Sequence, residues 1–155
     1  MILALCAAAF AVSPCQDGWV HRPGSESCYK FETAKPLNWN SVQATCASLG
    51  GHGVIFDSLE EIVWMRGYRS YRKELKQYLW TAGYEKNGVW NWYFDHEDYP
   101  LTVSDWAPGQ PDNHMGSQHC LALFGDWAGH TDATRYRFDD IGCEMAAAYV
   151  CEKNA

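Results

Sequence analysis

Six cysteines follow a short apolar segment at the start of this chain, and they constrain its fold more than any other feature. The segment 1–11 has the length and apolar character of a secretory signal peptide. Ala9-Phe10-Ala11 fits the cleavage rule, and a cut after Ser13 is also compatible with it. Removal of this segment takes away Cys6 and leaves Cys15, Cys28, Cys46, Cys120, Cys143 and Cys151. An even set of cysteines in a secreted chain predicts a disulfide framework, although six cysteines allow many connectivities.

Several classes of protein and site are excluded by simple observations. The apolar segment breaks at Ser13-Pro14, well short of the ~20 apolar residues that a membrane-spanning helix needs. No second apolar segment follows, so we expect a secreted, extracellular chain with no membrane anchor. The formal net charge of −7 at pH 7 argues against nucleic acid, which binds basic surfaces. Zinc is not expected because no C-x-x-C pair occurs.

Hydrophobic periodicity predicts two helices in the first half. Trp39, Val42, Cys46 and Leu49 fall on one face of a helix that Gly50-Gly51 would end. The tetrad Ser58-Leu59-Glu60-Glu61 is a capping box, and it predicts a second helix that runs to about Tyr71.

The second half predicts strands and loops. Short strands are expected at 79–84, 89–93, 120–124 and 147–151. The stretch from Asp95 to Gln118 has no convincing periodicity, and loops of that length in a compact domain are usually functional. Two helices followed by strands and loops predict one α+β domain over residues 15–152.

Oxygen-bearing side chains flank a proline in this loop. Gln110 and Asp112 stand on either side of Pro111, and the pair Asp139-Asp140 comes shortly before Cys143. Hard cations such as calcium take ~6–8 oxygen ligands from carboxylates, amides and carbonyls. The same side chains could also hold a hydroxylated ligand such as a sugar.

The ordered set of cysteines and tryptophans resembles the C-type lectin domain, from Cys15 through Glu152. The fragments that carry the resemblance are, in order, Cys15…Gly18-Trp19…Cys28-Tyr29-Lys30-Phe31, Trp39-Asn-Ser-Val-Gln-Ala44-Thr-Cys46, Leu79-Trp80-Thr-Ala-Gly83-Tyr84, Trp90-Asn-Trp92, Trp106-x-x-Gly109-x-Pro111, Cys120, Cys143 and Tyr149-Val-Cys151-Glu152. Within the family, Gly109-Gln-Pro-Asp-Asn113 and His119-Cys120-Leu121 look like secreted molluscan lectins of the perlucin type.

The resemblance implies a C-type lectin-like fold in its long form. That fold has two helices, short antiparallel strands and a long ligand-binding loop region. The implied disulfides are Cys15–Cys28, Cys46–Cys151 and Cys120–Cys143.

The resemblance also implies a calcium site. In the family, a proline between two ligating side chains is cis, which directs both side chains at one ion, and X-Pro bonds are the ones that adopt this form. The implied metal ligands are Gln110, Asp112, Gln118, Asp139 and Asp140. The implied sugar contacts are Gln110, Asp112, His114, Gln118, Asp139 and Trp127.

Two of these positions depart from the family pattern. Gln118 stands where a glutamate is expected, and Asp139 stands where an asparagine is expected. The number of carboxylates is therefore conserved, and we expect Ca²⁺ still to bind. His114 occupies the place where galactose-binding members often stack a tryptophan on the sugar, and Trp127 could substitute for it.

The implied function is calcium-dependent carbohydrate binding with a role in innate recognition of glycans. Family members with Gln-Pro-Asp tend toward terminal galactose or N-acetylgalactosamine, and those with Glu-Pro-Asn toward mannose-like sugars. One alternative is a biomineralisation matrix protein of the perlucin type that uses its acidic surface. Another is a lectin-like domain that binds protein. A homo-oligomer would raise the avidity of weak single sites, although no coiled-coil segment is present.

Two further patterns receive plainer interpretations. Asp139 and Asp140 are adjacent and cannot easily flank one glycosidic bond at the ~5–9 Å that hydrolysis requires, so an enzyme is not expected. The basic run is interpreted as a solvated helix face in preference to a sulfated-glycan site; it consists of Arg66, Arg69, Arg72, Lys73 and Lys76.

Overall fold

The computed structural model describes residues 13–126 and 131–155. The predicted signal peptide and Trp127 lie outside the described residues. No helix in the described part combines the length and the apolar character that crossing a membrane requires.

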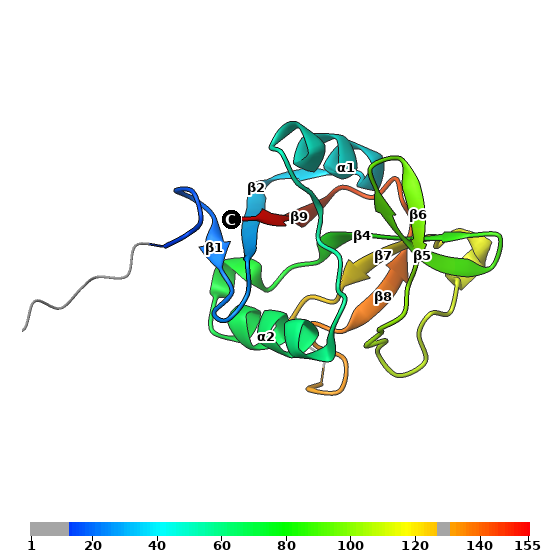
Figure 1. Cartoon of the computed structure of the whole chain (residues 1–155). Coiled ribbons are helices and arrows are strands. Elements are labelled where there is room, and N and C mark those ends of the chain that lie inside the picture. The colour runs from blue at the N-terminus through cyan, green and yellow to red at the C-terminus, as the bar shows by residue number, and fades with distance from the viewer. Residues whose placement is uncertain (1–12, 127–130) are drawn as a thin grey trace, which may run out of the picture.

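The described residues form an α+β domain, as predicted (Figure 1). The helices are α1 (Trp39–Ser48) and α2 (Leu59–Ser70), with short 3₁₀ turns η1 (Lys73–Leu75) and η2 (His114–Gly116). The strands are β1 (Val20–His21), β2 (Ser27–Leu37), β3 (His52–Gly53), β4 (Leu79–Lys86), β5 (Val89–Phe94), β6 (Glu97–Pro100), β7 (Cys120–Leu123), β8 (Phe138–Ile141) and β9 (Ala147–Asn154).

One mixed sheet organises the domain. Its main path runs β1-β2-β9-β4-β5-β6, with β7 paired to β4 and β8, and β3 paired to β9. The pairs are antiparallel except β4–β9, which is parallel, so the expectation of antiparallel strands was incomplete. The helices α1 and α2 lie on opposite sides of the β2–β9–β4 region (Figure 1). Each helix covers its own core, because Val42 of α1 and Ile62 of α2 belong to separate buried clusters.

Both helices begin where the sequence predicted. Ser58 caps α2 by accepting the Glu61 N–H at 3.2 Å, as a capping box requires. The Glu61 carboxylate returns to the Asp57 N–H at 3.4 Å instead of that of Ser58. In α1 the predicted face is buried except for Leu49, which is 38% exposed. That expectation was wrong because α1 ends at Ser48, and Leu49 is already the capping residue. Gly50 follows with a φ of +77°, a conformation that glycine adopts without strain.

The four predicted strands are present as β4, β5, β7 and β9, whereas β1, β2, β3, β6 and β8 were not among the predicted ranges. Residues 97–100 are all exposed because β6 pairs only with β5 at the edge of the sheet. Residues 138–141 are all buried although two of them are aspartates. Neither strand alternates apolar and polar residues, which is the pattern that identifies a strand in a sequence.

The three disulfides implied by the family resemblance are all present. Cys15–Cys28 closes the N-terminal hairpin, and Cys120–Cys143 joins the start of β7 to the segment after β8. Cys46–Cys151 ties α1 to β9 across a sequence separation of 105 residues. These links confirm the predicted framework.

A buried pair of carboxyl groups lies between α2 and β9. Glu61 accepts a hydrogen bond from the Tyr29 hydroxyl, and Glu152 accepts the Ile55 N–H at 3.2 Å. Burial, followed by the charge of Glu152, raises the pKa of Glu61, and burial also raises the pKa of Glu152. The folded protein therefore holds protons that the unfolded chain releases at the ordinary glutamate pKa, and its stability falls as the pH rises from about 4.5 toward neutrality.

We expect Glu61→Gln to flatten this fall. Each extra proton bound by the folded state contributes a slope of about 1.4 kcal/mol per pH unit, so unfolding by urea at pH 5 and at pH 7 with chelator present measures the effect. Glu60→Gln is the matched control, because Glu60 is exposed on the same helical turn and should keep the wild-type slope. An identical slope in Glu61→Gln and wild type would contradict the assignment.

Candidate functional site

Asp140 on β8 joins the sheet to the loop that contains Pro111. Its side chain is fully buried. One carboxylate oxygen accepts the Asp112 N–H at 3.0 Å and the other accepts the Asn113 N–H at 2.7 Å. Buried carboxylates are found where such charge-assisted bonds satisfy them. Asp140 therefore fixes the loop, which contains the predicted cis bond at Gln110–Pro111.

The other predicted ligands gather on the same short turn. The Gln110 side-chain oxygen accepts the Asp112 N–H at 3.0 Å, so it shares that amide with Asp140. The His114 N–H is shared in the same way by an Asp112 carboxylate oxygen at 3.1 Å and the Gln118 side-chain oxygen at 2.8 Å. Four of the five predicted ligands thus place oxygens around the backbone of residues 112–114.

Asn113 is a residue that the sequence interpretation assigned no role. Its side-chain oxygen accepts the Gln118 N–H at 3.0 Å and closes the loop from residue 113 to residue 118. Its φ of +43° lies in the left-handed region, which asparagine tolerates better than most residues. The sequence signal was an Asp-Asn pair directly after Pro111, which is typical turn chemistry.

Asp139 has a different environment from Asp140, because successive residues of a strand face opposite sides of the sheet. Its carboxylate accepts a hydrogen bond from the Tyr78 hydroxyl at 2.8 Å. Burial raises the pKa of Asp139 to about 6, with further contributions from the negative charges of Asp140 and Asp112. The negative charges of the loop site therefore act on the pKa of Asp139, although the hydrogen bond between its side chain and Tyr78 does not involve the backbone of the loop.

The donor set suits a hard cation by its chemistry. Two amide oxygens and three carboxylates are the ligand types that calcium takes, and an oxygen that accepts one N–H keeps a second lone pair. In this structure the carboxylates are not arranged as a compact acidic cluster. Among residues 13–126 and 131–155, no group of three or more His, Cys, Asp or Glu side chains is spaced to hold a metal ion. Calcium would thus depend on the amide oxygens of Gln110 and Gln118 as well as on the acids.

His114 and Met115 are among the exposed side chains at the rim of the loop. Met115 is 87% exposed with a φ of +59°. Among the described residues of this loop, no tryptophan follows the Gln110-Pro111-Asp112 motif. An apolar contact from this rim would therefore come from Met115 or from the imidazole of His114.

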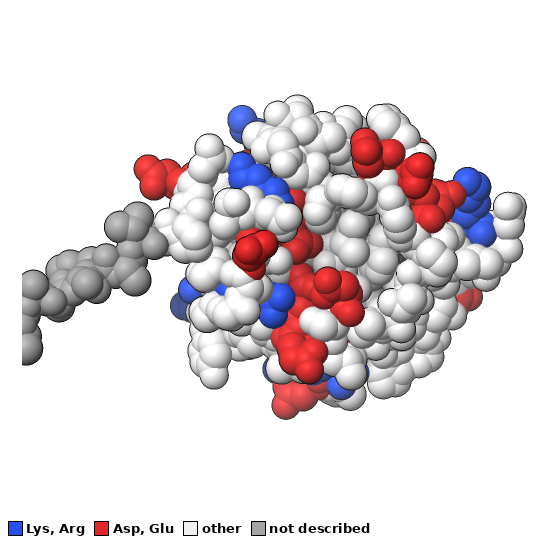
Figure 2. Space-filling model, viewed as in Figure 1, with Lys and Arg blue, Asp and Glu red and all other residues white. Residues whose placement is uncertain are grey.

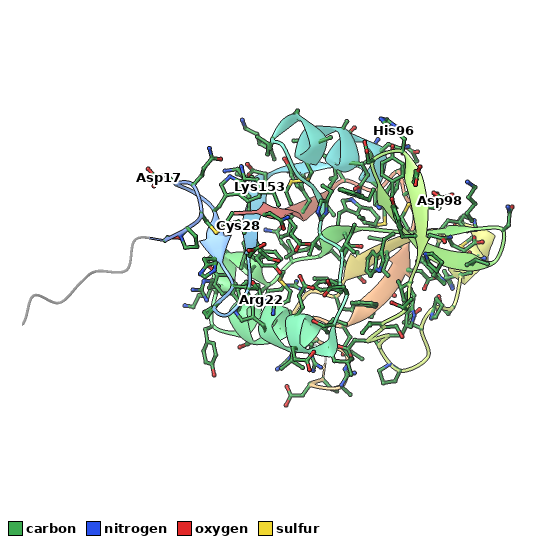
Figure 3. The ribbon with its side chains drawn as sticks, in the orientation of Figure 1. Asp17, Arg22, Cys28, His96, Asp98 and Lys153 are labelled. Atoms are coloured by element: carbon green, nitrogen blue, oxygen red, sulfur yellow. A yellow bond between two sulfur atoms is a disulfide. The ribbon has the colours of Figure 1, made fainter. Side chains whose placement is uncertain are left out.

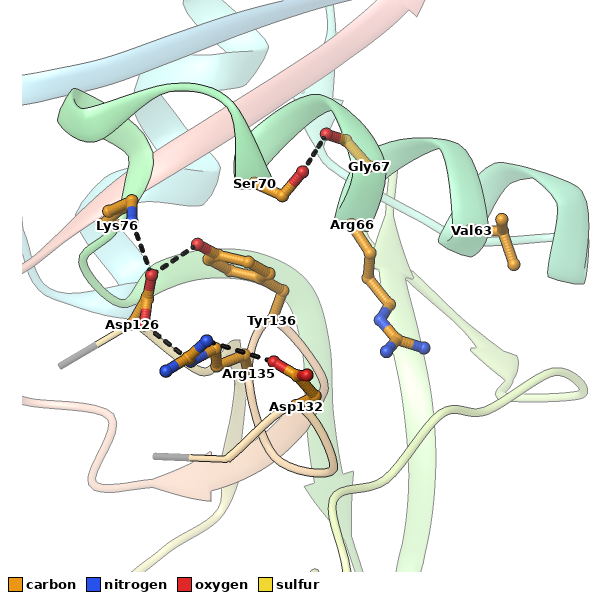
Figure 4. A pocket seen from close by; sticks show the side chains of 9 residues that line it. All are labelled: Val63, Arg66, Gly67, Ser70, Lys76, Asp126, Asp132, Arg135 and Tyr136. Atoms are coloured by element: carbon orange, nitrogen blue, oxygen red, sulfur yellow. Dashed lines mark hydrogen bonds and ion pairs between the residues drawn. The ribbon is translucent and has the colours of Figure 1, made fainter. Parts of the chain in front are cut away.

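The basic run does not form one solvated face. Arg69 is fully buried, so this part of the expectation was wrong. Lys76 and Arg135 both contact the Asp126 carboxylate at 2.7 Å, and the Tyr136 hydroxyl donates to it at 3.0 Å (Figure 4). Arg66, which lines the same cavity of about 510 Å³, pairs with Asp105 at 3.3 Å. These acids largely neutralise the cationic side of the cavity.

Comparison with known proteins places this geometry in a family. The sequence model of the lectin C-type domain family matches residues 35–153 of this chain. Perlucin from Haliotis laevigata is 31% identical over 129 residues, which cover 82% of this chain and 76% of that protein. The galactose-specific lectin nattectin from Thalassophryne nattereri is 25% identical over 146 residues, which cover 93% of this chain and 83% of that protein.

Solved structures agree with the sequence comparison. The Ca²⁺-independent C-type lectin SPL-2 from Saxidomus purpuratus superimposes with a TM-score of 0.71 at 26% identity, over 90% of this chain and 93% of that one. The segment that the family model matches, residues 35–153, includes α1, α2 and the loop with Pro111. The chain belongs to the C-type lectin domain family, whose members are carbohydrate-binding domains and not enzymes.

Proposed function

We propose that this chain is a secreted, calcium-dependent lectin for glycans that end in galactose or N-acetylgalactosamine. The observation that carries the proposal is the convergence of side-chain oxygens from Gln110, Asp112, Gln118 and Asp140 on the turn 112–114. Three disulfides support secretion, because such bonds persist in oxidising compartments.

The metal would be held by Gln110, Asp112, Gln118 and Asp140, whose oxygens already meet at this turn, and Asp139 would join them by exchanging its hydrogen bond with Tyr78 for the ion. Bound calcium supplies a positive charge that accepts sugar hydroxyls as ligands. The Gln110 amide would donate a hydrogen bond to one hydroxyl, and the Asp112 carboxylate would accept one from another. This order of donor and acceptor is the reason to favour galactose-type sugars over mannose-type sugars.

The relatives support the two parts of the proposal unequally. Nattectin is described as a galactose-specific lectin, which agrees with the sugar proposed here. SPL-2 is described as Ca²⁺-independent, so likeness of fold does not carry calcium dependence with it. A role in innate recognition of glycans fits a secreted lectin, and retention on sugar resins is the first property to test.

The experiment is retention on galactose resin in millimolar calcium, followed by elution with chelator. We expect the wild type to bind and elute. The double exchange Gln110→Glu/Asp112→Asn reverses the donor and acceptor at conserved net charge, and it should move retention from galactose resin to mannose resin. Tyr71→Phe, at a side chain 89% exposed on the capping residue of α2, is a control that should behave as wild type.

Each arm has an outcome that counts against the proposal. Failure of the wild type to bind galactose, N-acetylgalactosamine and mannose resins would refute a lectin of this kind. Retention that survives chelator would refute calcium dependence alone. Unchanged retention of the double exchange on galactose resin would refute the assignment of Gln110 and Asp112.

A further inference from the structure

A second cleft lies between α1 and the turn that joins β5 to β6. Its volume is about 490 Å³, within the ~300–1,000 Å³ that is typical of small-ligand sites. None of the described residues that line it belongs to the 110–118 loop or to β8. Figure 3 labels His96, which lies where this turn approaches α1. The cleft is therefore separate from the loop site.

Aromatic side chains and small residues both line this cleft. Trp39 of α1 meets Tyr93 of β5 edge-on, with ring centroids 5.9 Å apart. Phe94 is 40% exposed and meets the His52 ring edge-on at 4.9 Å. Ala44, exposed on α1, lines the same cleft. A row of rings opposite an alanine leaves room for a flat, partly apolar ligand.

The turn between β5 and β6 contributes two polar residues to the lining, Asp95 and His96. Asp95 and His96 have φ values of +49° and +65°, as in the tight hairpin turns in which both central residues are left-handed. Asn40 and Gln43 of α1 line the opposite side, and the Gln43 amide donates to the Thr81 carbonyl at 2.9 Å. The cleft is therefore lined by hydrogen-bonding groups as well as by aromatic rings.

The charge of the cleft limits what it can bind. Among the described lining residues Asp95 is the one carboxylate, and none is lysine or arginine. Acidic side chains also gather over β6 beside this turn (Figure 2), where Glu97 and Asp98 are exposed. An anionic ligand would be repelled, whereas a neutral or cationic ligand would not.

We propose that this cleft binds one pyranose ring of an uncharged sugar or amino sugar without calcium. A sugar ring has an apolar C–H face, which gains by burial against aromatic rings such as Phe94 and Tyr93. Its hydroxyls would exchange hydrogen bonds with Asn40 and Asp95. The site is independent of the proposed calcium site and adds a second contact to a glycan.

The test is an NMR titration of the wild-type protein in excess chelator, followed at the Trp39 indole N–H. The probes are methyl galactoside, methyl mannoside, N-acetylglucosamine and glucosamine, with N-acetylneuraminic acid as the anionic probe. We expect a saturable shift with at least one neutral or amino sugar and none with the anion. Ala44→Leu fills the cleft from α1 and should weaken binding at least about tenfold.

Controls separate this site from the other one. Ser41→Leu adds the same side chain at an exposed position of α1 that does not line the cleft, and it should bind as wild type. The excess chelator excludes any contribution from the proposed calcium site. The proposal is overturned by the absence of a saturable shift with every neutral and amino sugar, by equal binding of the anion, by wild-type affinity in Ala44→Leu, or by weakened binding in Ser41→Leu.

Discussion

Replacement of Asp140 by alanine should abolish calcium-dependent retention on galactose resin. The wild-type carboxylate accepts two backbone N–H groups, those of Asp112 and Asn113, from a fully buried position. Hydrogen bonds to a charged group contribute about 1.5–3 kcal/mol each. Without them the turn 112–114 loses its anchor to β8, and the oxygens of Gln110, Asp112 and Gln118 lose their common arrangement.

Asp140→Asn makes the test sharper because it conserves the volume of the side chain. An amide can accept one of the two N–H groups, but its NH₂ group faces the other donor. We expect retention to be lost in both variants while near-ultraviolet circular dichroism stays close to that of the wild type. Asp132→Ala removes a carboxylate that is 98% exposed, and this control should be retained normally. Wild-type retention of Asp140→Asn and Asp140→Ala would disprove the role of Asp140.

Arg69→Met should produce the largest loss of stability among single substitutions in α2. The buried guanidinium donates to the carbonyl groups of Leu75 at 3.2 Å, Gln77 at 2.7 Å and Phe124 at 3.1 Å. It also lies over the Tyr136 ring at 4.6 Å. Burial lowers the pKa of Arg69 to about 9, so the group remains charged at neutral pH.

Methionine fills part of the volume but removes the three hydrogen bonds from the guanidinium and its contact with the Tyr136 ring. Each hydrogen bond from a charged group contributes about 1.5–3 kcal/mol, so we expect a loss of about 3–5 kcal/mol in the free energy of unfolding. Urea unfolding at pH 7 measures it. Arg66→Met on the same helix removes only a partly exposed ion pair with Asp105, and the expected loss is below about 1 kcal/mol. Equal losses in the two variants would show that Arg69 is an ordinary helix residue.

These two residues show where sequence reasoning reached and where it stopped. Asp140 was identified because acidic and amide residues around Pro111 and before Cys143 form a pattern with a chemical meaning. Arg69 was assigned to a surface run, because its neighbours in the sequence are also basic. Its burial depends on carbonyl groups from Leu75, Gln77 and Phe124, and the last of these is 55 residues away. A one-dimensional pattern contains no information about such an acceptor.

The same division holds for the fold. Local signals identified the helix starts, since the Ser58 cap lies within one turn of the residues it serves. They did not identify β1, β2, β3, β6 or β8. The residues of β6 and β8 lack alternation, and these segments are strands because of the partners they meet in the sheet. The sequence did not predict the cleft beside α1 for a similar reason, because its lining brings together Trp39, His52 and Phe94 from three separate elements.

The sequence by itself determined the cysteine framework, the family and the residue types of the loop site, because these depend on identity and order along the chain. Only the tertiary structure decided that Asp140 fixes the loop through two backbone amides while the neighbouring Asp139 turns to Tyr78. The physical reason is the pleat of the strand, which sends adjacent side chains to opposite faces. Two identical carboxyl groups, one residue apart, thereby acquire different partners and different tasks.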